Sequence, residues 1–370
     1  MNDAKPHEAD LYIGLMSGTS LDGVDAVLAG FSPGQAPELA GTHYLPYPPE
    51  LRQRLLTLHA PQPNELHLAC VQAQELAGLY AQAVRELLEH AGVAPAPIAA
   101  LGAHGQTIRH RPEAGYTVQL VNGARLAELT GITSIVDFRS RDIAAGGQGA
   151  PLVPAFHAAM LSSPGEHRVI VNIGGIANLT DLAPHSPVTG FDCGPGNLLL
   201  DAWAGLHLGK PIDENGAWAA GGKILPALLD RLLKHDYFAA PAPKSAGREQ
   251  FNLDWLHAHL HGNEAPQDIQ ATLLELTARG IVDAAQIHCS GFEALYVCGG
   301  GAHNTALMKR LGELAGKPVQ STAVLGIEPD WMEALAFAWL AKQCLEGKPG
   351  NLPAVTGASG PRILGAIYPA

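Results

Sequence analysis

The chain has 370 residues, of which 47% are hydrophobic and 16% are charged, and its formal net charge is −12. A hydrophobic fraction of this size supports a globular protein of two domains and excludes an intrinsically disordered one. The acidic balance, without any cluster of lysines and arginines, excludes nucleic acid and anionic membrane as main partners.

The cysteines and the hydropathy pattern indicate the compartment. The five cysteines are far apart and form no CxxC pair, so we expect neither a disulfide framework nor a structural zinc site. The first ten residues, MNDAKPHEAD, lack the basic and apolar regions of a signal peptide. Apolar runs fall short of the ~18 residues that a membrane span needs. We therefore expect a cytoplasmic protein.

The first predicted elements are strands over residues 11–16 and 24–32, joined by a polar turn within GLMSGTSLDGVD, residues 14–25. Backbone N–H groups of such a turn can bind phosphate oxygens, and Asp22 or Asp25 could hold Mg²⁺. A plain reverse turn explains the same residues, because Asp-Gly is a preferred turn pair. The stretch is not a P-loop, since it lacks the lysine and precedes a strand.

The rest of the first half alternates helices and strands. A hydrophobic period near 3.6 residues predicts a helix over 64–91, with Asn64 as its cap. Shorter strands and helices follow over 98–103, 116–121, 123–130, 132–136 and 152–161. Strands that end in polar loops before helices are typical of α/β proteins, whose ligands collect at the strand ends.

Two polar stretches follow strand ends in this half of the chain. They are AHGQTIRHR, residues 103–111, and DFRSRD, residues 137–142. Polar side chains at such positions suit a sugar or another hydroxylated ligand. Gln106, Arg139 and Asp142 are the candidate contacts.

The second half begins as the first did. The linker SSPG at 162–165 separates predicted domains 1–163 and 164–370. A strand over 168–173, the turn Gly174-Gly175 and a strand over 176–182 then repeat the opening hairpin. This repeat favours a duplicated architecture, although the two hairpins differ in sequence.

The stretch FDCGPGN, residues 191–197, predicts a strand that ends at Asp192 and a helix that begins at Pro195. A carboxylate at a strand end is suited to general-base catalysis, and the helix N-terminus beside it favours an anion. Alternatively, Asp192 is the N-cap of that helix, although it lies slightly too early for this role.

Three glycines, Gly299 to Gly301, lie between a strand over 294–298 and a helix over 303–314, after a long helix over 268–289. A tight turn needs one glycine, whereas three allow a flat group such as a nucleotide to approach the backbone.

The last predicted helix begins at Asp330, in DWMEALAFAWLA, residues 330–341. Asp330 and Glu333 have the spacing of a capping box, which is the favoured interpretation. The alternative is that Glu333 contacts a substrate.

Eight stretches carry a family resemblance: GLMSGTSLDGVD (14–25), GAHGQT (102–107), DFRSRD (137–142), NIGGIANLT (172–180), GFDCGPGN (190–197), PKSAGRE (243–249), CGGGAHN (298–304) and DWMEALAFA (330–338). With these stretches in this order, the chain resembles the anhydro-N-acetylmuramic acid kinase family, within the superfamily of sugar kinases, actin and heat-shock ATPases. Cys193 and Ala246 depart from it, since the family pattern leads us to expect threonine at both.

The resemblance implies an α/β fold of two lobes with duplicated ribonuclease H-like cores, of the actin/hexokinase type, and ATP in the interlobe cleft. The N-terminal lobe would carry the first phosphate loop and part of the sugar site. The C-terminal lobe would carry the second phosphate loop, the catalytic aspartate and the adenosine site. A homodimer is also expected.

The resemblance further implies roles for single residues. Asp192 would be the catalytic base, Gln106, Arg139 and Glu333 would bind the sugar, and Mg²⁺ would accompany ATP. The expected ATP contacts are Gly18, Thr19, Ser20, Leu21, Asp22, Gly23, Val24, Asp25, Gly174, Gly175, Gly194, Asn197, Gly299, Gly300, Gly301 and Asn304.

The implied reaction opens the 1,6-anhydro ring of anhydro-N-acetylmuramic acid with water and phosphorylates O6. Its products are N-acetylmuramic acid 6-phosphate and ADP, in peptidoglycan recycling. One alternative is an ordinary sugar kinase without ring opening. Another is a non-catalytic nucleotide- or sugar-binding module, against which the presence of Asp192 argues.

Overall fold

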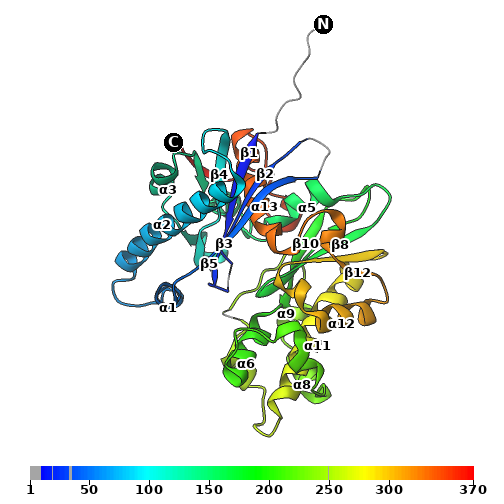
Figure 1. Cartoon of the computed structure of the whole chain (residues 1–370). Coiled ribbons are helices and arrows are strands. Elements are labelled where there is room, and N and C mark those ends of the chain that lie inside the picture. The colour runs from blue at the N-terminus through cyan, green and yellow to red at the C-terminus, as the bar shows by residue number, and fades with distance from the viewer. Residues whose placement is uncertain (1–9, 19, 33–35, 249) are drawn as a thin grey trace. The chain divides into compact units, whose positions relative to one another are not determined.

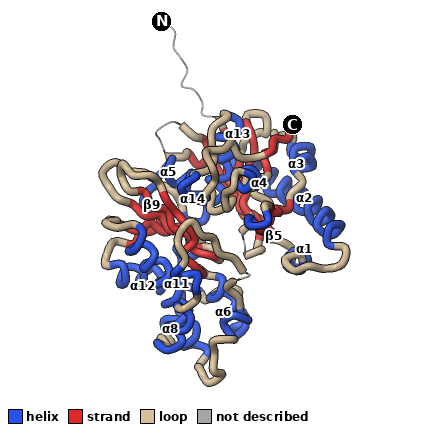
Figure 2. Tube along the Cα trace, turned by 180° about the vertical axis from the view of Figure 1, so that it is seen from behind, coloured by secondary structure: helices blue, strands red, loops and turns tan. Residues whose placement is uncertain are grey.

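The structure, a computed structural model, describes residues 10–18, 20–32, 36–248 and 250–370 (Figure 1). The chain folds into two compact units. Unit 1 contains the chain up to Leu152 together with Trp331–Asn351 and Ala358–Ala370, and unit 2 contains Val153–Asp330 and Leu352–Gly357. Each unit is built from one main sheet with helices packed against it (Figure 2).

The main sheet of unit 1 has the strand order β13-β7-β4-β1-β2-β3. Strands β1, β2 and β3 are antiparallel, β4 and β7 run parallel to β1, and β13 closes the edge antiparallel to β7. A separate hairpin pairs β5 with β6. The strands are β1 (Leu11–Met16), β2 (Gly23–Gly30), β3 (Glu38–Pro46), β4 (Ile98–Ala103), β5 (Gln106–Arg111), β6 (Tyr116–Leu120), β7 (Ser134–Val136) and β13 (Ala366–Tyr368).

Two long helices dominate the packing of unit 1. Helix α2 packs on β2 and β3, and its residues join Ile13 and Leu15 in one buried hydrophobic cluster. Helix α13 packs on β1 and β4. The helices of unit 1 are α1 (Pro49–Thr57), α2 (Glu65–Ala91), α3 (Gly123–Thr130), α4 (Ser140–Ala144) and α13 (Met332–Leu345), with the 3₁₀ turn η1 (Pro112–Ala114).

Helix α13 lies unusually close to the sheet because two strand residues are glycines. A Cβ atom on Gly14 of β1 would lie closer than 3.0 Å to the backbone of Ala334. A Cβ atom on Gly102 of β4 would be as close to the carbonyl oxygen of Phe337. Side chains alternate between the faces of a strand, so Ile13 and Leu15 face α2 while Gly14 faces α13.

The sheet of unit 2 has the order β10-β9-β8-β11-β12. Strands β8, β9 and β10 are antiparallel, and β11 and β12 run parallel to β8. This repeats the order and direction of β3-β2-β1-β4-β7, which confirms the predicted duplication. The strands are β8 (Arg168–Ile173), β9 (Ile176–Leu182), β10 (Thr189–Pro195), β11 (Ala294–Cys298) and β12 (Val319–Ser321).

Helix α11 forms the centre of unit 2. It packs on β9 and β10 and on helices α6, α7, α8 and α12, and most of its residues are buried. The helices are α5 (Val153–Leu161), α6 (Leu198–Leu208), α7 (Ala217–Ala220), α8 (Pro226–Leu233), α9 (Asp236–Ala239), α10 (Leu253–His257), α11 (Pro266–His288), α12 (Thr305–Ala315) and α14 (Pro353–Thr356), with the 3₁₀ turns η2 (Glu214–Gly216), η3 (Gly300–His303), η4 (Thr322–Leu325) and η5 (Pro329–Trp331).

The division between the units differs from the predicted domains 1–163 and 164–370. Helix α5 belongs to unit 2 because it packs on β9, where the His157 ring bonds to Thr180. Helix α13 returns to unit 1 because its backbone fits against the glycines of β1 and β4.

Several helix starts also differ from their predictions. Helix α6 begins at Leu198 and not at Pro195, because Pro195 still pairs with Ile176 as the last residue of β10. Asn64 has a left-handed backbone, with φ of 61°, and makes no capping bond from its side chain within the described residues.

The predicted capping box at Asp330 is wrong, because α13 begins at Met332 and the Asp330 carboxylate pairs with His303. Among the described residues, no helix combines the length and apolar character needed to cross a bilayer.

Replacement of Gly14 by alanine should destabilise unit 1. The added Cβ must displace α13, and overpacking of this kind costs about 1–3 kcal/mol or more in the free energy of unfolding. Gly78, inside α2, is the matched control, because a Cβ there meets no described atom within 4 Å. Gly78→Ala should stabilise by up to about 1 kcal/mol, since alanine favours helix. Urea unfolding measures both, and a Gly14→Ala variant as stable as the wild type would contradict the close packing.

His157 should make the protein less stable in acid. Its ring is fully buried, and burial lowers its pKa from 6.5 to about 3. The unfolded state therefore binds a proton at a higher pH than the folded state does. The contribution of the neutral ring to the free energy of unfolding is complete above pH ~6.5 and falls by about 1.4 kcal/mol per pH unit as the pH decreases toward 3. Between pH 7 and pH 5, the wild type should lose about 2 kcal/mol more in urea unfolding than His157→Gln. Equal losses would show that His157 does not cause this sensitivity.

Candidate functional site

The turn between β1 and β2 is held by buried side chains of unit 1. The Ser17 hydroxyl donates to Oε1 of Gln106 and accepts from the hydroxyl of Tyr47 at 2.7 Å. The amide of Gln106 also donates to the carbonyl oxygen of Gly18 at 3.1 Å. Tyr80 lies 3.2 Å from the Tyr47 hydroxyl. The structure thus brings the stretches 14–25 and 102–107 together, with Gln106 supporting the turn.

Within this turn, the predicted ATP contacts differ in what they can offer a ligand. Leu21 and Val24 are fully buried in the core, so their side chains cannot reach a ligand, and the N–H of Leu21 donates to the carbonyl oxygen of Gly18 at 3.4 Å. Gly23 is required by packing, because a Cβ would clash with Tyr44 and Leu45. Thr19 lies outside the described residues.

The polar tip of the turn is open. The Ser20 hydroxyl donates to Oδ1 of the exposed Asp22 at 2.6 Å. Among the described atoms, the Ser20 hydroxyl oxygen would be the nearest to a Cβ on Gly18, at 3.7 Å. Asp25 follows, half-buried in β2. Oxygen donors of this kind suit Mg²⁺, so Ser20, Asp22 and Asp25 fit the expected metal chemically.

Arg139 is held rigidly by its neighbours in unit 1. Its guanidinium donates to Nε2 of His104, at 2.8 and 3.1 Å, and to the carbonyl oxygen of Gly149 at 2.7 Å. Burial and then the nearby Arg139 charge keep the pKa of His104 well below its usual 6.5, so the ring is neutral and accepts these bonds. Asp142 is fully buried and accepts from the amide of Asn351 at 2.7 Å and from the N–H of Gly149 at 2.8 Å. Glu333 lies half-buried in the first turn of α13.

In unit 2, the turn between β8 and β9 is bound to the start of α6. The carbonyl oxygen of Gly174 accepts from the N–H of Asn197 at 2.8 Å. That of Gly175 accepts from Gly196 at 2.9 Å and from Leu198 at 3.0 Å. These N–H groups are therefore used within the protein, and the expectation that this helix N-terminus favours an anion does not hold for them.

The three glycines after β11 have different reasons for being glycine. Gly299 has φ of 75°, which favours glycine, and a Cβ on Gly301 would clash with Ile173. Gly300 is different, because the nearest atom to its Cβ would be the amide nitrogen of Asn197, at 3.8 Å. The fold explains two of the glycines, and Gly300 leaves open space beside Asn197. Asn304 caps α12 by accepting from the N–H of Leu307 at 3.0 Å.

Asp192 lies in β10 and is 7% exposed. Its Oδ2 accepts from the backbone N–H of Ala246 at 2.9 Å, and its own N–H donates to the carbonyl oxygen of Lys244 at 3.2 Å. The hydroxyl of Tyr237 donates to the Asp192 carbonyl oxygen at 2.7 Å. The pairing of β10 with β9 is irregular at Cys193, a bulge of the kind found beside active sites. Because α6 begins six residues later, Asp192 is not its N-cap.

Asp192 belongs to a polar row that the sequence reasoning missed. It pairs across the sheet with Asn178, which pairs with Asn172, and paired residues share a face. The row continues to Cys298, whose thiol contacts Oδ1 of Asn172 at 3.7 Å. Oδ1 of Asn178 is buried and has no hydrogen-bond partner among the described residues. One asparagine within each apolar strand of NIGGIANLT, Asn172 and Asn178, was the available signal.

The two departures from the family pattern lie on different sides of this row. Cys193 is 2% exposed and belongs to the hydrophobic core of unit 2, and burial raises the pKa of its thiol well above the usual value. It therefore faces away from Asp192. Ala246 contacts Asp192 through its backbone N–H, a bond that needs no hydroxyl.

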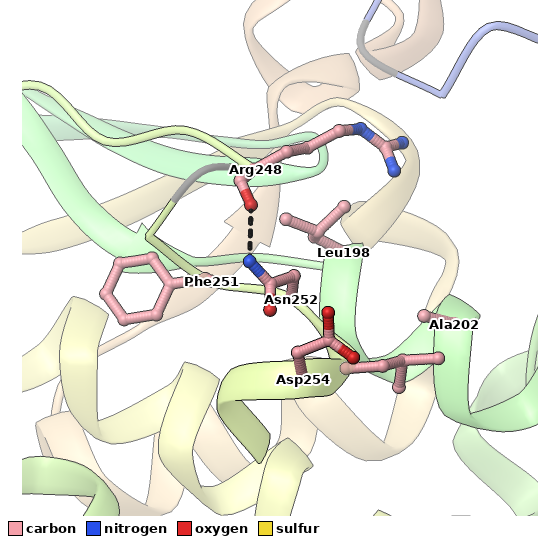
Figure 3. Close-up of a pocket in the computed structure, with 7 residues that line it drawn as sticks. Leu198, Ala202, Arg248, Phe251, Asn252 and Asp254 are labelled. Carbon is pink, nitrogen blue, oxygen red and sulfur yellow. Dashed lines mark hydrogen bonds between the residues drawn. The ribbon is translucent and has the colours of Figure 1, made fainter. Parts of the chain in front are cut away.

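A hollow of about 310 Å³ is lined in part by Arg248 of unit 2 (Figure 3). Leu198 and Ala202 of α6 form one wall, and residues 251–254 form another. The amide of Asn252 donates to the carbonyl oxygen of Arg248 at 3.0 Å, which fixes the chain at the rim.

Comparisons with known proteins match nearly the whole chain to a single family. The sequence model of a family described as anhydro-N-acetylmuramic acid kinase matches residues 10–370. Proteins with that name are 58% identical in Thiobacillus denitrificans, covering 100% of both chains, and 54% identical in Pseudomonas putida, covering 97% of this chain and 99% of the relative.

A solved structure, component A of (R)-2-hydroxyglutaryl-CoA dehydratase from Acidaminococcus fermentans, is similar with a TM-score of 0.48 at 13% identity, over 89% of this chain and 96% of that one. This likeness is too distant to indicate a function. The family match over residues 10–370 and the relatives of more than 50% identity show that the chain belongs to the anhydro-N-acetylmuramic acid kinase family.

Proposed function

We propose that this protein transfers the γ-phosphate of ATP to O6 of 1,6-anhydro-N-acetylmuramic acid while water opens the anhydro ring. The products are N-acetylmuramic acid 6-phosphate and ADP, for peptidoglycan recycling. The names of the relatives support the substrate and the reaction class. The structural observation that carries the proposal is the buried carboxylate of Asp192, oriented by the N–H of Ala246.

Asp192 is the proposed general base. Water attacks the anomeric carbon, the bond from this carbon to O6 breaks, and Asp192 takes the proton of the water. The oxygen released at O6 forms its bond to the γ-phosphorus, and ADP leaves. Because phosphoryl transfer needs mainly positioning and charge stabilisation, one well-placed base is sufficient for the proton transfer.

Backbone groups are the proposed phosphate ligands. In unit 1 these are the N–H groups of the turn from Gly18 to Asp25, and in unit 2 those of the turn at Gly174 and Gly175. Gly18, Gly174 and Gly300 support this proposal, because protein packing does not require glycine at these positions. Asp22 or Asp25 would hold Mg²⁺, which when bound neutralises charge on the phosphates.

Gln106, Arg139 and Glu333 are the proposed sugar contacts, all within unit 1. The bonds of Arg139 to His104 and Gly149 support this role, since a guanidinium that is already oriented loses little freedom when it binds a hydroxyl. Gln106 also supports the first turn, so its replacement should affect ATP as well as the sugar. The homodimer and the cytoplasmic location stay predictions.

Asp192→Asn should reduce kcat about 10²–10⁴-fold, because loss of a general base costs this much. ATP binding should be preserved. A coupled assay of ADP release with the anhydro sugar measures the loss, and calorimetry measures the ATP dissociation constant. Asp230→Asn, at an exposed carboxylate of α8, is the control and should have normal turnover.

Full turnover by Asp192→Asn would exclude it as the base. The same assay distinguishes the proposed reaction from that of an ordinary sugar kinase. An ordinary sugar kinase would release ADP with N-acetylmuramic acid or N-acetylglucosamine rather than with the anhydro sugar.

Gly300→Ala should raise the KM for ATP about tenfold or more while leaving the free energy of unfolding unchanged. Its Cβ fills space that the protein leaves open, so it interferes only with a ligand. Gly301→Ala is the matched contrast, since its Cβ meets Ile173, and it should destabilise the fold by about 1–3 kcal/mol. An unchanged KM for ATP in Gly300→Ala would place the nucleotide elsewhere.

A further inference from the structure

We propose that Lys244 is a positioning residue for the base: its ammonium group fastens the loop whose peptide groups hold Asp192. The inference rests on the proposed function, in which Asp192 takes the proton. Lys244 does not touch the reacting atoms in this scheme. It acts through the backbone of residues 244–246.

The ammonium group of Lys244 is held at several points. Nζ donates to the carbonyl oxygens of Tyr237, at 2.9 Å, and Phe238, at 3.4 Å, in helix α9. It also lies over the rings of Tyr237, 4.7 Å from the centroid, and Phe191, 5.5 Å from the centroid. Carbonyl oxygens and aromatic faces both attract a cation, so together they fix the position of the side chain.

The backbone of the same loop holds Asp192 at two points. The carbonyl oxygen of Lys244 accepts from the N–H of Asp192, and the N–H of Ala246 donates to the carboxylate. Tyr237, which binds the Lys244 ammonium through its carbonyl oxygen, also donates its hydroxyl to the carbonyl oxygen of Asp192. Lys244, Tyr237 and Asp192 therefore form a closed set of contacts around the base.

The loop needs such an anchor. Described residues 240–248 form neither helix nor strand, so no ladder of hydrogen bonds fixes their backbone. Beyond the anchor, the chain is held again where Asn252 bonds to Arg248 (Figure 3). Burial lowers the pKa of Lys244, while the attraction of the Asp192 carboxylate acts in the opposite direction. Without the lysine, the N–H of Ala246 would be free to move away from the carboxylate.

Lys244→Met tests this role. A displacement of about 1 Å in a reacting group can cost 10²-fold in rate, so we expect kcat to fall 10- to 100-fold. The KM values for ATP and for the anhydro sugar should change less than about twofold, because neither ligand contacts Lys244 in the proposed site. Lys244→Arg keeps a cation for the carbonyl oxygens and should restore most of the rate. Lys234→Met, at an exposed lysine after α8, is the control.

Tyr237→Phe is a second variant that keeps the ring and the carbonyl oxygen for Lys244 but removes the bond to Asp192. It should lower kcat less than Lys244→Met does, again without a change in KM. It also keeps the proposal testable if Lys244→Met fails to fold.

The double variant Asp192→Asn, Lys244→Met separates positioning from structural support. If Lys244 acts through Asp192, its loss should not lower the residual rate of Asp192→Asn any further. A further 10-fold fall in the double variant, or a wild-type kcat in Lys244→Met, would overturn the inference. If Asp192→Asn itself has full turnover, the proposed base fails instead.

Discussion

The buried carboxylate of Asp192 needs hydrogen-bond donors, and this need organises the surrounding part of unit 2. A carboxylate removed from water is costly unless polar groups replace the water. One such donor is the peptide N–H of Ala246, from a loop without regular secondary structure. The irregular pairing at Cys193 and the contacts of Tyr237 and Lys244 all act on the same few backbone atoms. The orientation of the Asp192 carboxylate, the proposed base, therefore depends on this loop as well as on strand β10.

Glycine serves two purposes in this protein, and only the structure separates them. Gly14, Gly102 and Gly301 are glycines because another part of the fold occupies the space of a Cβ. Gly174 and Gly300 have no such neighbour among the described residues, which is why they carry the proposed phosphate site. A count of glycines in a turn is therefore weaker support for a phosphate site than the surroundings of each one.

The elements that could be predicted from the sequence are those that local hydrophobic periodicity determines. The strands 11–16, 98–103, 168–173, 176–182 and 294–298 agree with β1, β4, β8, β9 and β11, because apolar runs and glycine turns mark them. The edge strand β3 was missed because none of its residues is buried, so it has no apolar face. The short β13 was missed because its partner β7 is distant in the sequence. Asp330 illustrates the same limit: its partner His303 is 27 residues away, so the capping spacing was misleading. The polar row beside Asp192 depends on strand register, which local pattern does not reveal.

The duplication preserves a position and not a set of residues. In both units, the turn after the first strand carries a glycine with open space beside it, Gly18 in unit 1 and Gly174 in unit 2. Side chains of Ser17 and Gln106 support the first turn, whereas backbone N–H groups at the start of α6 support the second. Two such different supports produce the same turn in the same sheet position. That is why the hairpins share little sequence while the strand order repeats in full, and why we expect replacement of the open glycine to affect ligand binding more than folding.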